Sequence, residues 1–433
     1  MKILLVCPKY RFEGYTPTGL ASVASIAERL GHNVRIVDLN IEPLHKDNYD
    51  IIGLTGLSSW KDSIIKTSKL FHNSTVIVGG PWATIQPEEA IAHDSINYVF
   101  VGEGEDTFQE FLLKYPNIEN VRGVYTKSGA GEPRPFIKDL DKLPFPSWHL
   151  LRLGMYKRVT IITSRGCPNN CVFCNAHLFV GKVWRKRSPE SVISEIELLV
   201  NKYKVKRITI GDENATLIPE RFEEICDLIV NKKLKAKFDA VQGIRLDTLN
   251  KRLLIKMKKA GFDEITIAPE SGSERIVNEI IGKKFNLSEV EDIVKICREI
   301  GLVVNSFFVI GFPEETKEEI DQTLKFAEKI RKLGGGSCYV GNAIPIPKTR
   351  LYEEAKKKNA LLYNGSKLDW IIEHRPREIH CLKSLSNEWK PEEIIKIIKK
   401  EELKNLKNVY FGSRKPIKML KGFYKCMRYI LKL

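Results

Sequence analysis

The chain has 433 residues, a length that allows two or three domains. Hydrophobic residues make up 43% and charged residues 29%, which is ordinary for a folded protein and excludes a disordered one. Lys and Arg (70) exceed Asp and Glu (54), giving a net charge of +16. This surplus fits an anionic partner such as nucleic acid, a phosphorylated substrate or an acidic membrane surface. Composition alone favours the other interpretation, a solvated lysine-rich surface.

The sequence contains no segment that is long and apolar enough to span a bilayer as a helix. The N-terminal run 2–7 ends in Cys-Pro-Lys without a small-residue cleavage site, so we interpret it as a buried strand and not as a signal peptide. We therefore expect a cytoplasmic protein with reduced thiols. Its nine cysteines are too few for a disulfide scaffold in a chain of this length.

Residues 1–115 alternate apolar runs with segments of helical spacing. The apolar runs are rich in Ile, Leu and Val, which predicts a parallel sheet with helices on both faces. This domain is therefore predicted to be doubly wound α/β, that is, Rossmann-like. The predicted strands are 2–7, 34–39, 51–57, 75–80 and 98–102, and the predicted helices are 19–31, 61–72, 87–94 and 106–115.

Glycines and hydroxyl groups follow the third, fourth and fifth predicted strands, at the sheet edge where such domains bind ligands. Glycine lets the backbone approach a large or phosphorylated group, although each residue could also be a simple turn glycine. Three such loops in succession favour a ligand. The candidate residues are Thr55, Gly56, Ser58, Ser59, Gly79, Gly80, Gly102, Glu103 and Gly104.

Residues 116–157 are rich in proline and glycine and are interpreted as a connector without long elements. Residues 158–350 repeat the strand-then-helix pattern six times, which predicts a partial (βα)6 barrel with its site at the carboxyl ends of the strands. Residues 351–433 look helical and lysine-rich. The predicted barrel strands are 158–164, 207–211, 237–241, 264–268, 303–310 and 337–340, and the predicted helices are 189–203, 219–231, 250–260, 287–300 and 317–333.

Three cysteines with the spacing C-x3-C-x2-C follow the first predicted barrel strand: Cys167, Cys171 and Cys174. Three thiols on one short loop, in a reducing compartment, indicate a metal or cluster site. A structural zinc site normally has four protein ligands, and His177 is the local candidate for a fourth. A Cys3His zinc site is therefore the alternative to a cluster.

Over residues 155–350 the chain resembles the radical S-adenosylmethionine (radical SAM) enzymes, through this cysteine motif and the aromatic residue before its last cysteine. In that family the cysteines hold a [4Fe–4S] cluster, and one open iron binds the amino and carboxylate groups of SAM. An electron from the cluster then cleaves SAM to a 5′-deoxyadenosyl radical. The resemblance implies that Cys167, Cys171 and Cys174 bind the cluster and that SAM contacts Phe173, Gly211, Asp212, Glu213, Glu270, Ser271, Gly311, Pro313 and Ile344.

A doubly wound domain before such a barrel resembles the cobalamin-binding subgroup of radical SAM enzymes. The resemblance implies that the glycines and hydroxyl groups of the N-terminal domain cradle the nucleotide tail of cobalamin. Other cobalamin domains ligate cobalt through the His of an Asp-x-His-x-x-Gly motif, which the loop 7–14 lacks. The subgroup therefore implies cobalt without a His ligand from this loop, and Tyr10 and Trp60 are candidates either to cover it or merely to pack.

The C-terminal end carries much of the basic surplus. Residues 397–433 contain eleven Lys and Arg against two Glu, and in 416–433 the basic residues recur every three or four positions. This spacing predicts a basic amphipathic helix. The helix could contact the inner face of an anionic membrane peripherally, or its apolar side could pack on the barrel. Radical SAM enzymes that modify transfer RNA usually carry an extra cysteine-bearing domain or an RNA-binding β-barrel. The flanks of this sequence show no second cysteine cluster and no β-rich tail, so the resemblance disfavours nucleic acid as a partner.

The function implied by the resemblance is methylation of an unactivated carbon with a [4Fe–4S] cluster, SAM and cobalamin. The substrate would be a small molecule or a lipid such as an isoprenoid, and an external reductant of flavodoxin or ferredoxin type would supply single electrons. A cyclase or carbon–carbon coupling enzyme similar to the anaerobic Mg-protoporphyrin ester cyclases is one alternative. A non-catalytic cobalamin-binding sensor or scaffold is another. Asp212, Arg245 and Tyr339 are further candidates to contact the substrate, although each could equally pack or pair within the barrel.

Overall fold

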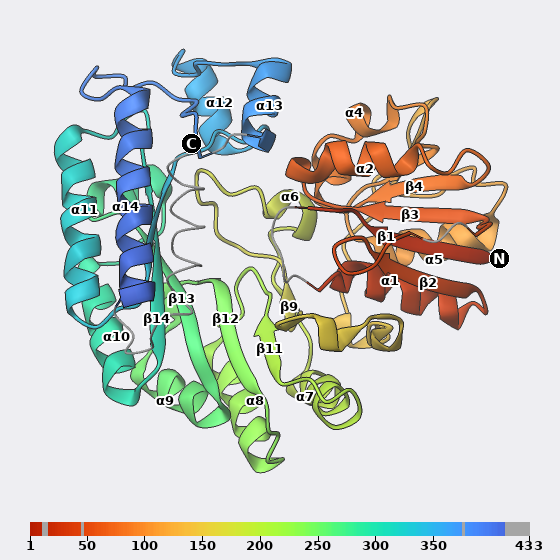
Figure 1. The fold of residues 1–433 in the computed structure, drawn as a ribbon, viewed down its shortest axis with the longest axis horizontal. Coiled ribbons are helices and arrows are strands. Elements are labelled where there is room, and N and C mark those ends of the chain that lie inside the picture. Colours follow the sequence, from red (N-terminus) through yellow and green to blue (C-terminus); the bar gives the residue numbers. More distant parts are fainter. Residues whose placement is uncertain (11–15, 45–46, 375–376, 412–433) are drawn as a thin grey trace. The chain divides into compact units, whose positions relative to one another are not determined.

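The structure is a computed structural model that describes residues 1–10, 16–44, 47–374 and 377–411 (Figure 1). These residues form two compact units. The first comprises Met1–Pro168, Ala176–Glu213 and Lys232–Lys237. The second comprises Asn169–Asn175, Asn214–Asn231 and the described residues from Phe238 onward.

A seven-stranded sheet forms the centre of the N-terminal domain, with the strand order β2-β1-β3-β4-β5-β6-β7. The strands from β2 to β5 pair in parallel, and β6 and β7 extend the sheet as antiparallel strands. These last two strands come from the segment in which no long element was expected, and they are indeed short. The strands are β1 (Lys2–Cys7), β2 (Asn33–Asp38), β3 (Ile51–Thr55), β4 (Thr75–Gly79), β5 (Tyr98–Phe100), β6 (Val124–Thr126) and β7 (Gly129–Ala130).

Helices cover both faces of this sheet, with α1 and α5 on one side and α2 and α4 on the other (Figure 1). The core between them consists of the alternating apolar residues of the strands, and residues such as Ile52 and Val78 are fully buried there. The doubly wound fold predicted for this domain is confirmed. The helices are α1 (Thr18–Arg29), α2 (Lys61–Ser68), α3 (Pro81–Ile85), α4 (Pro87–Ile91) and α5 (Gly104–Lys114).

The remainder of the first unit contains the start of the second α/β series. Strands β8 (Val159–Ile161) and β11 (Arg207–Ile210) pair in parallel. Strands β9 (Ser164–Arg165) and β10 (Arg185–Lys186) form a small antiparallel ladder that the sequence did not predict. The short helix α6 (His177–Val180) lies between β9 and β10, and α7 (Pro189–Glu197) continues in a π-helical turn, Leu198–Lys202. The Ser188 hydroxyl caps α7 by accepting the Ser191 N–H.

In the second unit, four consecutive strands pair in parallel in chain order: β12 (Lys237–Ile244), β13 (Phe262–Glu270), β14 (Val303–Ile310) and β15 (Cys338–Asn342). The helices of this series are α8 (Pro219–Asn231), α9 (Lys251–Ala260), α10 (Leu287–Ile300) and α11 (Lys317–Lys332), with a π-helical segment at Ile276–Ile281. Gly261 and Gly301 end α9 and α10 in the left-handed conformation, which glycine adopts at a helix C-terminus without a steric penalty. The alternating strand and helix order of this domain is confirmed.

The C-terminal region adds α12 (Arg350–Lys357), α13 (Gly365–His374) and α14 (Pro391–Phe411) to the second unit. Helix α14 packs along β15, and an ion pair of 2.8 Å joins Arg331 of α11 to Glu401 of α14. The basic segment 416–433 lies outside the described residues. Within the described part of the chain, the helices are too short or too polar to cross a membrane.

Candidate active site

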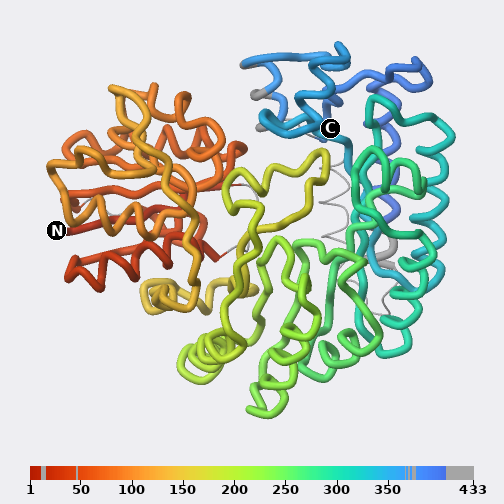
Figure 2. The backbone as a smooth tube through the Cα atoms, turned by 180° about the vertical axis from the view of Figure 1, so that it is seen from behind, coloured from red at the N-terminus to blue at the C-terminus, as the bar shows by residue number. Residues whose placement is uncertain are grey.

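The cysteine loop is defined here as residues 166–184, between β9 and β10 (yellow in Figure 2). The two arms of this loop approach each other closely at its base. Gly166 has φ +90°, and a Cβ there would lie 2.2 Å from the carbonyl oxygen of Val183, so this position requires glycine. In the same unit, the Cys167 N–H donates to the carbonyl oxygen of Gly181 at 3.2 Å. The first cysteine is therefore fixed by the backbone of the returning arm.

Cys171 and Cys174 are held by apolar anchors in the second unit. Val172 between them is buried, and its N–H donates to the carbonyl oxygen of Ile281 at 3.2 Å. Phe173 packs against Phe312 with ring centroids 6.2 Å apart. The turn closes where the Cys174 N–H donates to the Cys171 carbonyl oxygen at 3.0 Å. All three cysteines are half-buried.

Arg245, at the end of β12, is oriented toward Cys171. Its Nη1 lies 4.0 Å from the Cys171 Sγ. Nε and Nη2 donate to the carboxylate of Asp247 at 2.9 and 2.7 Å, and Nη2 also donates to the Lys283 carbonyl oxygen at 2.7 Å. These bonds fix the guanidinium, and a cation beside a thiol favours its thiolate form. The sequence left open whether Arg245 contacts the substrate or pairs within the barrel, and in the structure it lies beside a cysteine.

Asp212, a predicted SAM contact after β11, is buried in the first unit and bonded to the segment that leads into β9. Its carboxylate accepts from the N–H and hydroxyl of Thr163 at 2.7 and 2.6 Å and from the Ser164 hydroxyl at 2.6 Å. The neighbouring Gly211 has no room for a side chain, since a Cβ would lie 2.5 Å from Thr160. Burial raises the pKa of Glu213 to about 7; its own backbone N–H opposes this rise and the Asp212 charge adds to it.

The predicted SAM contacts after β13 are both engaged within the fold. Glu270 has φ +69°, an uncommon conformation for a residue with a side chain, and its carboxylate accepts from Lys283 Nζ at 2.7 Å. Lys283 also donates to the Ala268 carbonyl oxygen at 2.8 Å. The Ser271 hydroxyl is buried and lies 2.8 Å from that of Thr323. These contacts fix the shape of the loop after β13.

The loop after β14 contains the predicted contacts Gly311 and Pro313. The Glu315 carboxylate accepts the N–H groups of Gly311 at 2.6 Å and Phe312 at 3.2 Å. Burial raises the pKa of Glu315 to about 8, against the effect of these two N–H groups. Phe312 and Ala343, the neighbour of Ile344, belong to the same apolar core as Val172 and Phe173. The structure therefore brings the second half of the cysteine motif together with two of the predicted SAM loops.

Two residues of the C-terminal region also hold this loop, and sequence reasoning missed both. His380 Nε2 lies 3.1 Å from the Gly311 carbonyl oxygen, and Trp389 Nε1 donates to the Glu315 carbonyl oxygen at 2.8 Å. Both side chains are buried. No local motif marks them in the sequence, because their partners lie 69 and 74 positions away.

In the N-terminal domain, the predicted cobalamin residues lie at the carboxyl ends of β3, β4 and β5, as expected. The loops after β3 and β4 are in close contact: Gly80 has φ +86°, and a Cβ there would lie 2.3 Å from the Thr55 hydroxyl. The Trp82 N–H donates to the Gly56 carbonyl oxygen at 3.1 Å. Ser58 and Ser59 begin a 3₁₀ turn that ends at Trp60. The Trp60 ring stacks on Tyr10 with centroids 4.1 Å apart.

The loop after β5 differs in that one predicted ligand contact is an ion-pair partner. Gly102 has φ +82°, and its N–H donates to the Thr84 hydroxyl at 3.0 Å. Gly104 begins α5. The Glu103 carboxylate accepts from Arg165 at 3.0 Å and from Arg185 at 2.8 Å. This carboxylate therefore contacts the two strands that flank the cysteine loop.

Comparison with known proteins supports the interpretation of both the N-terminal domain and the barrel domain. Residues 161–327 match the Radical SAM superfamily, and residues 3–112 match the B12 binding domain. An uncharacterized methyltransferase of Pyrococcus horikoshii is 36% identical over 395 residues, which cover 84% of each chain. The chain therefore belongs to the radical SAM superfamily, in the family of cobalamin-dependent methyltransferases, and it is a radical SAM enzyme.

Two more distant proteins are also similar to this chain. The hopanoid C-3 methylase of Methylococcus capsulatus is 25% identical over 352 residues, covering 73% of this chain and 65% of its own. The solved structure of the cobalamin-dependent radical enzyme OxsB, with aqua-cobalamin and SAM bound, superposes with a TM-score of 0.77 at 18% identity. That match covers 99% of this chain and 70% of OxsB, and at this identity it supports the fold.

Membership of the family implies a [4Fe–4S] cluster, SAM and cobalamin as cofactors. The donor set fits the cluster, because three half-buried thiols lie on one loop beside a fixed cation. Among the described residues, no group of three or more His, Cys, Asp or Glu side chains is arranged so that it could hold a metal ion. In the N-terminal domain, Gly102 in the loop after β5 has open space where a side chain would lie, whereas the space at Gly80 is filled by Thr55.

Proposed function

We propose that this enzyme methylates an unactivated carbon of a small organic substrate. The observation that carries the proposal is the occurrence in one chain of a C-x3-C-x2-C loop in a radical SAM domain and of a B12-binding domain. When bound, the cluster and SAM supply a radical that removes hydrogen, and cobalamin supplies the methyl group. The protein must bind these groups, orient them and exclude water.

For the cluster, we assign the three ligand positions to Cys167, Cys171 and Cys174. The backbone hydrogen bond from Cys167 to Gly181 holds the base of the loop. Val172 and Phe173 anchor the part of the motif between Cys171 and Cys174. Arg245 stabilises negative charge on the Cys171 sulfur, since its guanidinium is fixed by Asp247 and by the Lys283 backbone.

For SAM, we assign the loops after β11, β13, β14 and β15, as in the sequence interpretation. We propose Glu213, which follows β11 at the position the resemblance implies, as the acceptor for the SAM amino group. Asp212, Glu270 and Ser271 act mainly through the loops they fix, because each already bonds to neighbouring protein groups. The Gly311 loop, held by Glu315, offers backbone for the adenine side.

For cobalamin, we assign the loops after β3, β4 and β5. Thr55, Gly56, Ser58 and Ser59 would line one side of the nucleotide tail, and Gly79 and Gly80 at the end of β4 would line the other. Gly102 and Gly104 flank the loop that Glu103 fixes by its ion pairs.

The proposal is tested by anaerobic reconstitution of the full chain with iron, sulfide, SAM and cobalamin. We expect Cys174→Ala to lose the cluster absorbance and the cleavage of SAM to 5′-deoxyadenosine. Cys226→Ala is the matched control, because Cys226 is buried in α8, away from the motif. A Cys174→Ala protein that still cleaves SAM would contradict the cluster assignment. A wild-type protein that holds no iron would favour the sensor or scaffold alternative.

Product mass separates methylation from the cyclase and coupling alternatives, because methylation adds the mass of one CH2 group and the others do not. We propose a lipid or isoprenoid as the substrate class to test first. Its support is the basic, amphipathic pattern of 416–433 in the sequence and the similarity to a hopanoid methylase. Lipid extracts of deletion and wild-type cells are compared by mass spectrometry, and unchanged methylation of all extractable lipids would exclude this class.

The proposed electron donor is a reductant of flavodoxin or ferredoxin type. It is tested by replacing the chemical reductant with a reduced flavodoxin in the SAM cleavage assay. Cleavage that proceeds with dithionite but not with flavodoxin or ferredoxin would contradict this partner. Peripheral membrane contact through 416–433 is tested separately, by sedimentation of the full chain with anionic vesicles.

A further inference from the structure

We propose that Glu103 and Glu105 are positioning residues that couple the cobalamin loop to the cysteine loop, so that the two sites load cooperatively. The proposal rests on the proposed function, because it takes the loop after β5 as part of the cobalamin site. It concerns four side chains of the first unit, here called the charge quartet: Glu103, Glu105, Arg165 and Arg185.

The first observation is that two arginines face each other at the base of the cysteine loop. In the antiparallel ladder of β9 and β10, Arg165 is directly opposite Arg185. Like charges directly opposite in a ladder repel each other and destabilise the pair. The two-residue strands β9 and β10 are short, so this base needs another source of stability.

Glu103 provides this stability by bridging both cations. Its carboxylate lies 3.0 Å from Arg165 Nη1 and 2.8 Å from Arg185 Nη1. The side chains of Glu103 and Arg185 are each only 7% exposed, so solvent screens the interaction weakly. The second Glu103 oxygen also accepts the Ile137 N–H at 2.7 Å, which fixes the carboxylate.

Glu105 completes the charge balance. Its two oxygens accept from Arg165 Nη2 at 2.6 Å and Nη1 at 3.3 Å, so the pair is bidentate. Burial alone would raise the pKa of Glu105, but the charge and hydrogen bonds of Arg165 hold this pKa below its usual value. The carboxylate therefore stays charged, in the first turn of α5 where the helix dipole favours an anion.

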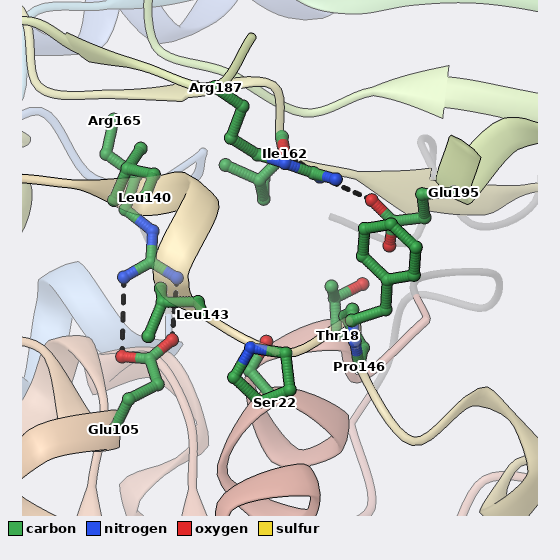
Figure 3. A pocket seen from close by; sticks show the side chains of 12 residues that line it. Thr18, Ser22, Glu105, Leu140, Leu143, Pro146, Ile162, Arg165, Arg187 and Glu195 are labelled. Atoms are coloured by element: carbon green, nitrogen blue, oxygen red, sulfur yellow. Dashed lines mark hydrogen bonds and ion pairs between the residues drawn. The ribbon is translucent and has the colours of Figure 1, made fainter. Parts of the chain in front are cut away.

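Figure 3 shows the Glu105–Arg165 pair on one side of a small cavity and the Arg187–Glu195 pair on the other. The cavity measures about 50 Å³, enough for a few water molecules and too small for a cofactor. Its lining is mixed, because Thr18 and Ser22 of α1 lie beside apolar residues such as Leu140, Leu143 and Ile162. The four side chains of these pairs are each less than one-fifth exposed, so a charge that lost its partner would meet little solvent.

Arg185 extends the connection to the cysteine loop itself. Its Nη2 donates to the Val180 carbonyl oxygen at 2.6 Å, and the next residue, Gly181, accepts the Cys167 N–H at 3.2 Å. Arg165 lies two positions before Cys167. On the other side, Glu103 lies between Gly102 and Gly104 in the loop after β5, which is part of the proposed cobalamin site. A shift of either loop therefore strains the same four charges, which is the condition for coupling between two sites.

The test compares the dissociation constant of hydroxocobalamin, measured by absorbance titration, in cluster-loaded and cluster-free full-length protein. For the wild-type chain we expect the cluster to tighten cobalamin binding by at least about fivefold. For Glu103→Gln we expect this ratio to fall to about one. Glu110→Gln is the matched control, because Glu110 lies on α5, the helix that begins directly after Glu103, and pairs with Arg134 and Lys114 outside the quartet. Its ratio should equal that of the wild type.

A second variant separates coupling from folding. Glu103→Gln leaves an excess positive charge, whereas the double variant Glu103→Gln, Arg185→Gln removes one charge of each sign. We expect the double variant to regain thermal stability without regaining the ratio. If the wild-type ratio is one, or if the double variant keeps the wild-type ratio, the coupling is overturned while the proposed function stands. A wild-type protein that binds no cobalamin overturns both.

Discussion

His380 holds the Gly311 loop by a hydrogen bond from its Nε2–H to the Gly311 carbonyl oxygen, at 3.1 Å and across 69 positions of the chain. Gly311 has φ +86°, and a Cβ there would lie 2.7 Å from His380 Cε1, so the close approach requires glycine. Burial lowers the pKa of His380 to about 4, against the effect of this hydrogen bond. The imidazole is therefore neutral near pH 7, and the C-terminal region acts directly on a candidate SAM loop.

Replacing His380 with Ala should destabilise the protein and weaken SAM binding. The variant loses a buried hydrogen bond and leaves a cavity, which together cost about 2–4 kcal/mol. Urea unfolding measures the first effect, and equilibrium binding of SAM to the cluster-loaded protein measures the second. His72→Ala is the control, because His72 is exposed in the N-terminal domain. Unchanged SAM affinity in His380→Ala would show that the imidazole serves stability alone.

Glu315 should make stability depend on pH. Its pKa in the fold is about 8 against an ordinary value of 4.5, so folding favours the protonated carboxyl. The contribution of this group to the free energy of unfolding is complete below pH 4.5 and is lost as the pH rises through 8. Within this window the slope is about 1.4 kcal/mol per pH unit. His380 acts in the opposite sense, because its contribution to the free energy of unfolding is complete above pH 6.5 and is lost as the pH falls through 4.

The contribution of Glu315 is isolated by subtracting the stability of Glu315→Gln from that of the wild type at each pH. We expect the difference to decline steadily between pH 5 and 8, as measured by urea unfolding. The amide keeps an acceptor for the Gly311 and Phe312 N–H groups but does not titrate. A difference that stays constant over this range would mean that Glu315 is ionised in the fold.

Removing the charge of Arg245 should lower the midpoint potential of the cluster. Loss of a cation 4.0 Å from the Cys171 sulfur favours the oxidised, less negative form of the centre. We expect Arg245→Gln to shift the potential by tens of millivolts, where about 60 mV is a tenfold change for one electron. Potentiometric titration followed by electron paramagnetic resonance measures the shift. Arg252→Gln is the control, because Arg252 is exposed and pairs with Glu223.

Removing one partner of the Lys283–Glu270 ion pair should destabilise the protein much more than removing both partners. Both side chains are less than one-tenth exposed, and their ion pair measures 2.7 Å. Lys283→Met leaves the Glu270 charge buried without this partner, which we expect to cost about 3–5 kcal/mol. The double variant Lys283→Met, Glu270→Gln should recover most of this loss in thermal or urea unfolding. Equal destabilisation of the single and double variants would show that the loss comes from Lys283 packing and not from charge.

Much of the fold could be predicted because its elements are determined by local patterns. The predicted segments 219–231, 287–300 and 303–310 coincide with α8, α10 and β14. Helix spacing, strand-forming runs and C-terminal glycines act within a few residues, so one sequence suffices to locate them. By contrast, β6, β7, β9 and β10 have two or three residues each, and they depend on partners that the local sequence does not specify.

The candidate site divides in the same way. The sequence by itself determined the cysteine motif and the order of the loops at the strand ends, because both are patterns of residue type and spacing. Only the tertiary structure decided that Arg245 lies at Cys171, that His380 holds Gly311, and that Glu103 bridges Arg165 and Arg185. These pairs are 62 or more positions apart. Hydrogen bonds and ion pairs at such separations form only when the packed core brings their backbones together, and no local pattern records them.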